Sequence, residues 1–282
     1  MTAVVLTSAL PPRRRSWTLL VGLGLVAVVV GTALVSLVWL PFDPSDTSGT
    51  RLEAPSTAHW LGTDKLGRDL ATQLMIGARI ALTVGLGSVA VGALVGVSVG
   101  LVAAFAASWL DDTLSAALDV VIAFPVLLLA MLIVAAQGAS LGSVILAIGL
   151  AMSAVVARLT RVLTKRVLGE QFVTAARTSG TRWPGIVARH ILPNIWPTLS
   201  VNLALQFGVA VLAEASLSYL GLGAPPPNAS WGRLLQEAQG TVATAPVGAI
   251  APGLALVALV IGVNFVADGL RDVADPSRRR SR

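Results

Sequence analysis

Several residue types are scarce or missing from this 282-residue sequence. It has no cysteine, which excludes disulfides, thiol nucleophiles and thiolate metal ligands from this chain. It has two histidines, and only 12% of its residues are charged. The GxxxxGK[S/T] motif of nucleotide-binding loops does not occur. We therefore predict no catalytic and no metal-binding residues, and any ATP must be bound by another chain.

Apolar residues dominate what is present. They make up 55% of the chain, and the mean hydropathy is +0.81. Such a composition predicts an all-α, polytopic membrane protein rather than a water-soluble core. About 20 helical residues are needed to cross the hydrocarbon of a bilayer. On that basis we predict about six spans, at residues 17–40, about 79–109, about 114–136, about 141–157, 197–220 and 246–267.

Two short segments define the connections of the early spans. Residues 137–140 separate the third and fourth spans and predict a tight helical hairpin. Three arginines, 13–15, precede the first apolar run, as they would in a signal peptide. That run is too long for a signal peptide and lacks a small-residue cleavage site, so we expect an uncleaved first span.

The cations are unequally distributed between the two sides of the predicted topology. Fifteen Lys or Arg lie in the termini and in the loops that follow the second and fourth spans, and five lie on the opposite side. The positive-inside rule therefore places both termini in the cytoplasm. The net charge of +6 is explained by contact with membrane lipids, without a nucleic-acid partner.

This topology divides the chain into five parts. They are a cytoplasmic tail (1–16), a first transmembrane helix (17–40), an extracytoplasmic loop (41–78), a transmembrane core (79–267) and a basic cytoplasmic tail (268–282). The core includes a polar loop at 158–196 and an outer loop at 221–245.

Glycines and two carboxylates stand out within the spans. Gly92, Gly96 and Gly100 recur every four residues and allow another helix to approach closely, either as a moving interface or as static packing. Asp119 and Glu214 are the clear ionisable residues, and no cation is evidently placed to face either one. They have a structural role in the bundle or belong to a proton or ion relay.

The polar loop at 158–196 carries seven Lys or Arg and its own helix signals. Residues 169–179 are compatible with a short helix, and Gly180 can provide a left-handed stop. Thr181 can cap a second helix, which is expected to end before Pro193. The pattern indicates a docking element for a soluble partner, with anchoring on lipid as the alternative.

The loop resembles the EAA motif of permeases of ATP-binding-cassette (ABC) importers, which reads EAA, three residues, Gly, nine residues, I-x-LP. The matching residues here are Thr174-Ala175-Ala176, Gly180 and His190-Ile191-Leu192-Pro193. Thr174 replaces the Glu and His190 replaces the Ile. The second departure resembles the dipeptide and oligopeptide subfamily, of which the sequence RHILPN at 189–194 is typical. Four further segments are similar to the second permease subunit of that subfamily, in the same order: 59–82, 118–130, 214–235 and 264–276.

The resemblance implies a type I ABC-importer permease fold with a cytoplasmic coupling helix between spans four and five. It implies a non-catalytic, C-type permease subunit in the plasma (inner) membrane that passes dipeptides or oligopeptides. The implied partners are a homologous second permease, two ATPase subunits or domains that bind ATP and magnesium, and an extracytoplasmic substrate-binding protein. This chain would hold no cofactor of its own. Nickel, a peptide-like solute or haem are alternative cargoes, and an ion-coupled secondary transporter is the alternative mechanism.

Three groups of candidate site residues follow. The resemblance assigns coupling to the ATPase to Thr174, Ala175, Ala176, Arg177, Gly180, Thr181 and Trp183. Candidates for lining the pathway, or for hydrogen bonds between spans, are Asn202, Gln206 and Ser216. Candidates for docking the binding protein, or for pairing within the outer loops, are Asp64, Arg68, Asp69 and Arg233.

Overall fold

The computed structural model describes residues 17–225 and 229–274, and its regular elements are helices. In chain order they are α1 (Trp17–Val38), α2 (Leu70–Phe105), α3 (Ser108–Ala123), α4 (Val126–Gln137), α5 (Leu141–Leu168), α6 (Gln171–Thr178), α7 (Trp183–Ile186), the π-helix η1 (Val187–Ile191), α8 (Leu192–Tyr219), α9 (Trp231–Ala238) and α10 (Val247–Ala274). The tail at 1–16 and the end of the basic tail, 275–282, lie outside the described residues.

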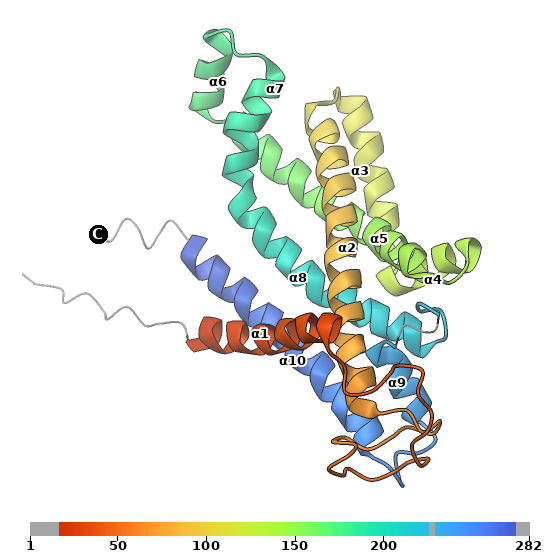
Figure 1. Ribbon diagram of the computed structural model, residues 1–282. Coiled ribbons are helices and arrows are strands. Elements are labelled where there is room, and N and C mark those ends of the chain that lie inside the picture. Colours follow the sequence, from red (N-terminus) through yellow and green to blue (C-terminus); the bar gives the residue numbers. More distant parts are fainter. Residues whose placement is uncertain (1–16, 226–228, 275–282) are drawn as a thin grey trace, which may run out of the picture.

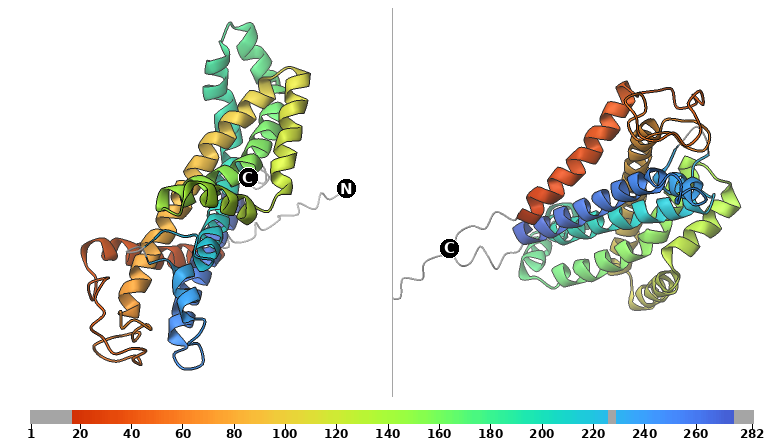
Figure 2. Two further views of the ribbon diagram at one scale, coloured as in Figure 1. Left: turned by 90° about the vertical axis from the view of Figure 1, so that its right-hand side faces the viewer. Right: turned by 90° about the horizontal axis from the view of Figure 1, so that it is seen from below.

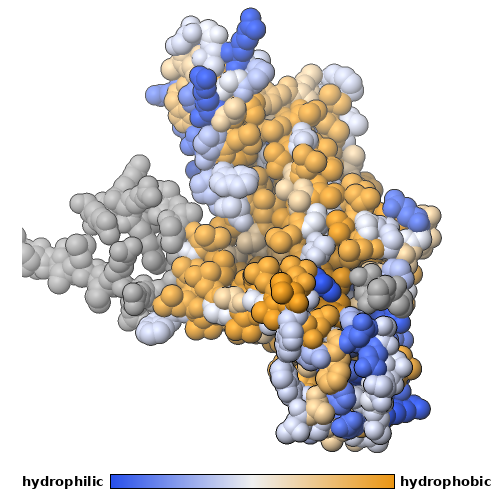
Figure 3. Space-filling view, in the orientation of Figure 1, coloured by the Kyte–Doolittle hydropathy of each residue, from blue (hydrophilic) through white to orange (hydrophobic). Residues whose placement is uncertain are grey.

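The helices form a long bundle with a small structure at each end (Figure 1). At one end α6 and α7 project beyond the bundle, and at the other α9 lies beside the irregular segment 39–69. We call α9 together with 39–69 the α9 platform. Two further views show the same separation of the two ends (Figure 2). Hydrophobic side chains cover the helices between them, and hydrophilic ones gather at the two ends (Figure 3).

Five of the described helices are long and apolar enough to cross a membrane: α1, α2, α5, the continuous helix Trp183–Tyr219 and Val247–Arg271. The helices α3 and α4 together would form a sixth span, but they are bent by 90° with respect to each other. The number of predicted spans is therefore confirmed if this bent pair is counted as one span.

The prediction of an unbroken third span at 114–136 is wrong. Helix α3 ends at Ala123 and α4 begins at Val126, with Phe124 in an extended conformation (φ −81°, ψ 134°). Pro125 is the cause, because its ring disfavours helical geometry at the residue before it. The predicted hairpin at 137–140 is confirmed, since Gly138 has φ 84° and Ser140 caps α5 through a capping box with Ser143.

The second span begins nine residues earlier than the predicted Arg79. Its first residue is Leu70, and the Asp69 side chain accepts a hydrogen bond from the Thr72 backbone N–H as the N-cap. The helical turns at 70–78 contain Thr72 and Gln73, whose polarity hid them from a hydropathy criterion. The segment predicted as a loop at 41–78 is therefore irregular only as far as Asp69.

The helix after Gly180 does not end before Pro193, contrary to prediction. It continues through η1 into α8 as one helix from Trp183 to Tyr219. In η1 the Leu192 N–H bonds to the carbonyl of Val187, five residues back. This wider turn gives the ring of Pro193 room beside the preceding turn. The helix therefore continues through Pro193, although proline has no backbone N–H to donate.

Helices α2 and α5 lie in close contact along the predicted glycine stripe. A Cβ atom placed on Gly96 would lie 2.6 Å from the Ser153 carbonyl oxygen, and one on Gly100 would lie 2.5 Å from that of Ala157. On the facing helix, a Cβ on Gly149 would lie 2.7 Å from the Val91 Cβ. The two backbones therefore touch, as small-residue repeats allow in membrane bundles.

Two hydrophobic clusters surround this contact. One joins α2, α4, α5 and α8 through residues such as Ile80, Val144 and Leu217. The other joins α1, α2, α8, α9 and α10 and includes Trp231 and Leu259. Helices α2 and α8 each contribute to both clusters, so these two helices connect the two halves of the bundle.

We expect Gly100→Ala to destabilise the protein, because the added methyl would collide with the α5 backbone. Overpacking of this kind costs about 1–3 kcal/mol. The matched control is Gly24→Ala, where a Cβ would meet nothing within 4 Å on helix α1 and alanine favours a helix by about 0.5–1 kcal/mol. Thermal unfolding in detergent measures both variants. Equal melting temperatures for the two would contradict the close α2–α5 contact.

Candidate functional site

The predicted docking element is a small helical pair that projects from the bundle on an apolar base (Figure 1). We call residues 169–191 the α6–α7 loop. It rests on an apolar base formed by Val173, Ile186 and Ile191 together with Ile195 of α8, each at most 2% exposed. Leu101 of α2 and Leu163 of α5 pack against these side chains. The loop is therefore fixed to the ends of two long helices.

One face of α6 remains exposed above this base. Thr174, Ala175 and Arg177 are exposed, whereas Val173 is buried and Ala176 packs against the base. The exposed side chains at 174 and 175 are short, so a partner can approach the helix closely. The outward face of α6 thus contains three of the seven predicted coupling residues.

Gly180 ends α6 in the predicted way. Its φ is 82°, a left-handed conformation that glycine adopts without strain. The Thr181 N–H bonds to the Ala176 carbonyl at 3.1 Å, and the Gly180 N–H bonds to that of Arg177 at 2.9 Å. This pair of bonds is a Schellman motif. It reverses the chain tightly and brings α7 back beside α6.

The predicted cap of the second helix is displaced by one residue. Arg182, with φ −71° and ψ 153°, is the N-cap of α7, and no side chain caps that end. Pro184 in the first turn has no backbone N–H to satisfy, which reduces the need for a side-chain cap. Thr181 instead belongs to the turn, where its backbone N–H closes the Schellman motif.

Trp183 joins three helices. The guanidinium carbon of Arg177 lies 4.5 Å from the centre of the Trp183 ring, within the range of a cation–π contact. The Phe105 ring, at the end of α2, meets the same tryptophan edge-on, with 5.0 Å between centroids and 70° between planes. Phe105 was not among the predicted site residues, because it is 78 positions away in sequence and no local pattern pairs the two.

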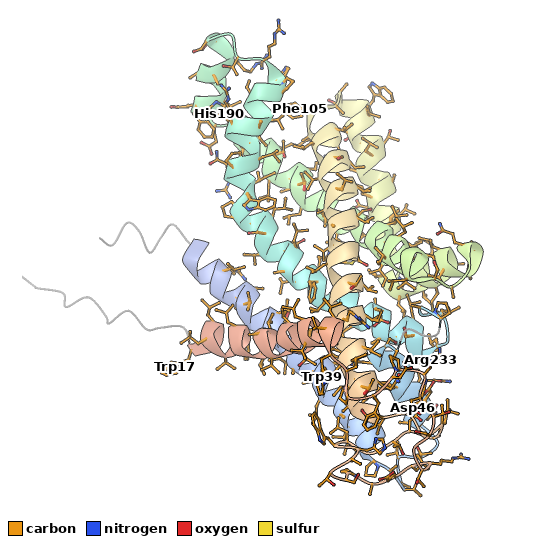
Figure 4. All side chains as sticks on the ribbon, viewed as in Figure 1. Trp17, Trp39, Asp46, Phe105, His190 and Arg233 are labelled. Carbon is orange, nitrogen blue, oxygen red and sulfur yellow. The ribbon has the colours of Figure 1, made fainter. Side chains whose placement is uncertain are left out.

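His190 lies on the same loop (Figure 4). Its ring centroid is 6.1 Å from that of Phe172 on α6. The other histidine, His59, lies on the α9 platform, where its Nδ1 is 3.0 Å from an Asp69 carboxylate oxygen.

At the opposite end of the molecule, three of the four predicted docking residues take part in ion pairs: Asp64, Arg68 and Arg233. Arg68 connects the 39–69 segment to α9, with its Nε 2.6 Å from Asp64 and its Nη2 2.6 Å from Glu237. Arg233 also pairs with Glu237, at 2.9 Å. Asp69 caps α2 and contacts His59. Pairing within the outer loops is thus observed, and through Glu237 it also joins the two parts of the platform.

Trp231 anchors the platform to the bundle. Only 2% of its surface is exposed. Its indole N–H donates to the Leu74 carbonyl at 3.0 Å, and its ring occupies the space left by Gly77, where a Cβ would lie 2.3 Å from the ring. The hydrophobic start of an amphipathic α9 was the signal in the sequence that could have identified it.

The candidate pathway residues all lie on α8 but do not converge. Asn202 and Gln206 are one turn apart and therefore share a face. Gln206 is buried, and the Asn202 Oδ1 is buried without a hydrogen-bond partner among the described residues. Ser216, further along, donates to the Leu212 carbonyl at 2.8 Å.

The two carboxylates within predicted spans differ from each other. Asp119 has a cation partner, contrary to prediction, because the Arg158 Nη1 of α5 lies 3.2 Å from its Oδ1. Both side chains are more than half exposed, at 60% and 59%. Glu214 is buried in α8, and its Oε1 accepts a hydrogen bond from the Ser218 hydroxyl at 2.6 Å.

Comparisons with known proteins give a consistent result. Residues 92–280 match the family described as binding-protein-dependent transport system inner membrane component. The chain is 35% identical over 255 residues to the dipeptide transport system permease protein DppC of Alkalihalophilus pseudofirmus, covering 90% of this chain and 83% of that one. It is 37% identical to the glutathione transport system permease protein GsiD of Pectobacterium atrosepticum, covering 89% and 84% respectively.

A solved structure has a similar fold. It is that of the MetNI methionine ABC transporter in inward-facing conformations, with a TM-score of 0.61. The match covers 72% of this chain and 96% of that chain, at 20% sequence identity.

We expect Gly180→Val to loosen the α6–α7 loop, because a β-branched residue is strained at φ 82°. Gly180→Asn is the control, since asparagine tolerates this conformation. Limited trypsin digestion, which cuts after Arg177 and Arg182, measures local opening of the loop. Cleavage should be several-fold faster in the valine variant than in the asparagine variant. Identical rates would show that the turn does not depend on its left-handed residue.

Proposed function

The chain belongs to the family of binding-protein-dependent transport system inner membrane components, and from this premise we propose that it imports dipeptides or oligopeptides as the C-type permease subunit of its transporter. As a member of this family it is a multi-pass inner-membrane permease of an ABC importer, which works with ATPase and substrate-binding partners. The observation that carries the proposal is the exposed face of α6 on its rigid base, at the opposite end from the α9 platform.

The ATPase docks on the α6–α7 loop. The short side chains of Thr174 and Ala175 leave the α6 backbone open to a cleft, and Arg177 and Trp183 flank this face. Gly180 and Thr181 set the angle of the turn through the Schellman motif. The sequence has no nucleotide-binding loop of its own, so ATP and magnesium belong to two ATPase subunits or domains. This chain is non-catalytic.

The α9 platform faces the extracytoplasmic substrate-binding protein. Its ion pairs Asp64–Arg68–Glu237–Arg233 hold it as one unit, and the anchor Trp231 attaches it to α2. A homologous second permease completes the pathway. ATP binding draws the docking loops of the two permeases together and shifts the pair to an outward-facing packing. Hydrolysis of ATP then returns the two permeases to the inward-facing packing.

The proposed cargo follows from the relatives, which are named as permeases for dipeptides and for glutathione, a tripeptide. The polar groups Asn202, Gln206 and Ser216 on α8 are neutral, which suits a pathway with low selectivity and leaves the choice of solute to the binding protein. A nickel, peptide-like or haem cargo would use the same machinery.

The α6–α7 loop and both termini lie in the cytoplasm in this proposal. The loop and the residues around it carry cations at 158, 161, 165, 166, 177, 182 and 189, as expected for a cytoplasmic segment. The end of α10, with Arg271, is also remote from the α9 platform (Figure 1).

Because the chain has no cysteine, its orientation can be measured with single introduced cysteines. We expect Leu66→Cys, 53% exposed on the platform, to react in intact cells with a membrane-impermeant maleimide. Thr178→Cys, exposed on α6, should react only after the membrane is opened. Ala147→Cys, which is fully buried, is the control and should stay unlabelled. Labelling of Thr178→Cys in intact cells would reverse the proposed orientation.

The function is tested in liposomes that contain the complete complex with its binding protein. We expect ATP enclosed in the liposomes, on the side that corresponds to the cytoplasm, to drive uptake of alanyl-alanine or glutathione. Dissipation of the proton gradient should leave this uptake intact. Gly180→Pro should abolish uptake, because proline cannot adopt φ 82°, whereas Gly180→Asn should retain most of it. Uptake that needs the gradient and not ATP would establish an ion-coupled carrier instead.

A further inference from the structure

We propose that Phe105 is a positioning residue for import: through Trp183 it fixes the orientation of the α6–α7 loop on the end of α2, so that movement of the loop moves α2. This inference rests on the proposed function, since it assumes that the loop receives the ATPase. It adds a residue outside the loop to those that transmit the signal.

The contact lies at the terminus of α2. Phe105 is the last residue of this 36-residue helix, and the next residue, Ala106, has extended backbone geometry (φ −70°, ψ 158°). One turn earlier, Leu101 packs on the apolar base of the α6–α7 loop. The final turn of α2 therefore contacts the loop twice, at the base through Leu101 and near the exposed face through Phe105.

Trp183 transmits the contact to α6. Phe105 meets its ring edge-on at 5.0 Å, and Arg177 of α6 lies over the ring at 4.5 Å. Three side chains from α2, α7 and α6 thus form one cluster. Phe105 and Trp183 are 37% and 41% exposed, so this cluster lies outside the packed base and orders the exposed part of the loop.

The geometry favours a positioning role over general stability. A partly exposed aromatic pair contributes little to a whole bundle, but it can set the balance between two orientations of a small loop. An edge-on pair of this kind corresponds to about a two- to tenfold change in such an equilibrium. The buried base holds the loop in place in either case, since Val173 and Ile186 do not depend on Phe105 for their burial partners in α5 and η1.

Helix α2 then connects the two ends of the molecule. A helix of 36 residues is about 54 Å long. Its first turns hold Trp231 of the α9 platform, through the Leu74 carbonyl and the space at Gly77. Its last turn holds Trp183. A tryptophan therefore contacts each end of α2, one from the platform and one from the α6–α7 loop.

The positioning is measured first on the chain alone, by trypsin cleavage after Arg177 and Arg182. We expect Phe105→Ala to speed cleavage about two- to tenfold and Phe105→Tyr, which keeps the ring, to restore the slow rate. Val102→Ala is the matched control, since Val102 lies on the same end of α2 and is 59% exposed. Cleavage of Phe105→Ala at the wild-type rate would overturn the proposal. This readout requires no partner, so it remains valid if the proposed function fails.

The consequence for transport is measured in liposomes that contain the complete complex, with alanyl-alanine and glutathione as probes. We expect Phe105→Ala to lower the number of peptides imported per ATP hydrolysed about two- to tenfold, with rescue by Phe105→Tyr. Loss of stability alone would lower import and hydrolysis together and leave this ratio unchanged, and that result would overturn the proposal. Phe105→Ala combined with Trp183→Ala should be no worse than Trp183→Ala alone. If the wild-type complex imports neither probe with ATP, the proposed cargo is wrong, and the cleavage result still decides the role of Phe105.

Discussion

The direct contact between the backbones of α2 and α5 is the constraint on which the rest of the structure depends. In a bilayer the lipid is as apolar as the side chains, so helices associate through close packing rather than through the exclusion of water. Gly96 and Gly100 on α2 and Gly149 on α5 leave no space for a further carbon atom. This contact fixes the axis of α2, and α2 in turn positions the α9 platform at its start and the α6–α7 loop at its end.

Charge is placed around this apolar contact in a way that reinforces it. Asp111, in the first turn of α3, is 5% exposed and forms two bonds to Arg161 of α5, at 2.5 Å and 2.7 Å, and a third to Lys165. A bidentate guanidinium–carboxylate pair is among the stronger polar contacts in proteins. It ties α3 to α5 at the end of the bundle near the α6–α7 loop. At the other end Arg68, Glu237 and Arg233 join the two parts of the platform.

The sequence was sufficient to predict features that depend on local pattern. The apolar runs, the hairpin at Gly138 and the left-handed turn at Gly180 were all identified, because each depends on a few neighbouring residues. The effects of Pro125 and Pro193 were harder to predict. Pro125 breaks a helix and Pro193 does not, since η1 widens the turn before it. In contacts over long sequence separations, such as Phe105 with Trp183 or Trp231 with Leu74, no local signal identifies the partner residue.

The two connections of the α6–α7 loop to the bundle differ in stiffness, and this difference determines where a movement of the loop must go. On the α5 side the helix ends at Leu168, and Gly169 and Glu170 separate it from α6. On the α8 side the helix runs without a break from Trp183 to Tyr219. A displacement of the loop can be absorbed at Gly169, but it is passed on directly to α8. Since α8 and α2 both contact α9, movement of the loop reaches the platform by two routes.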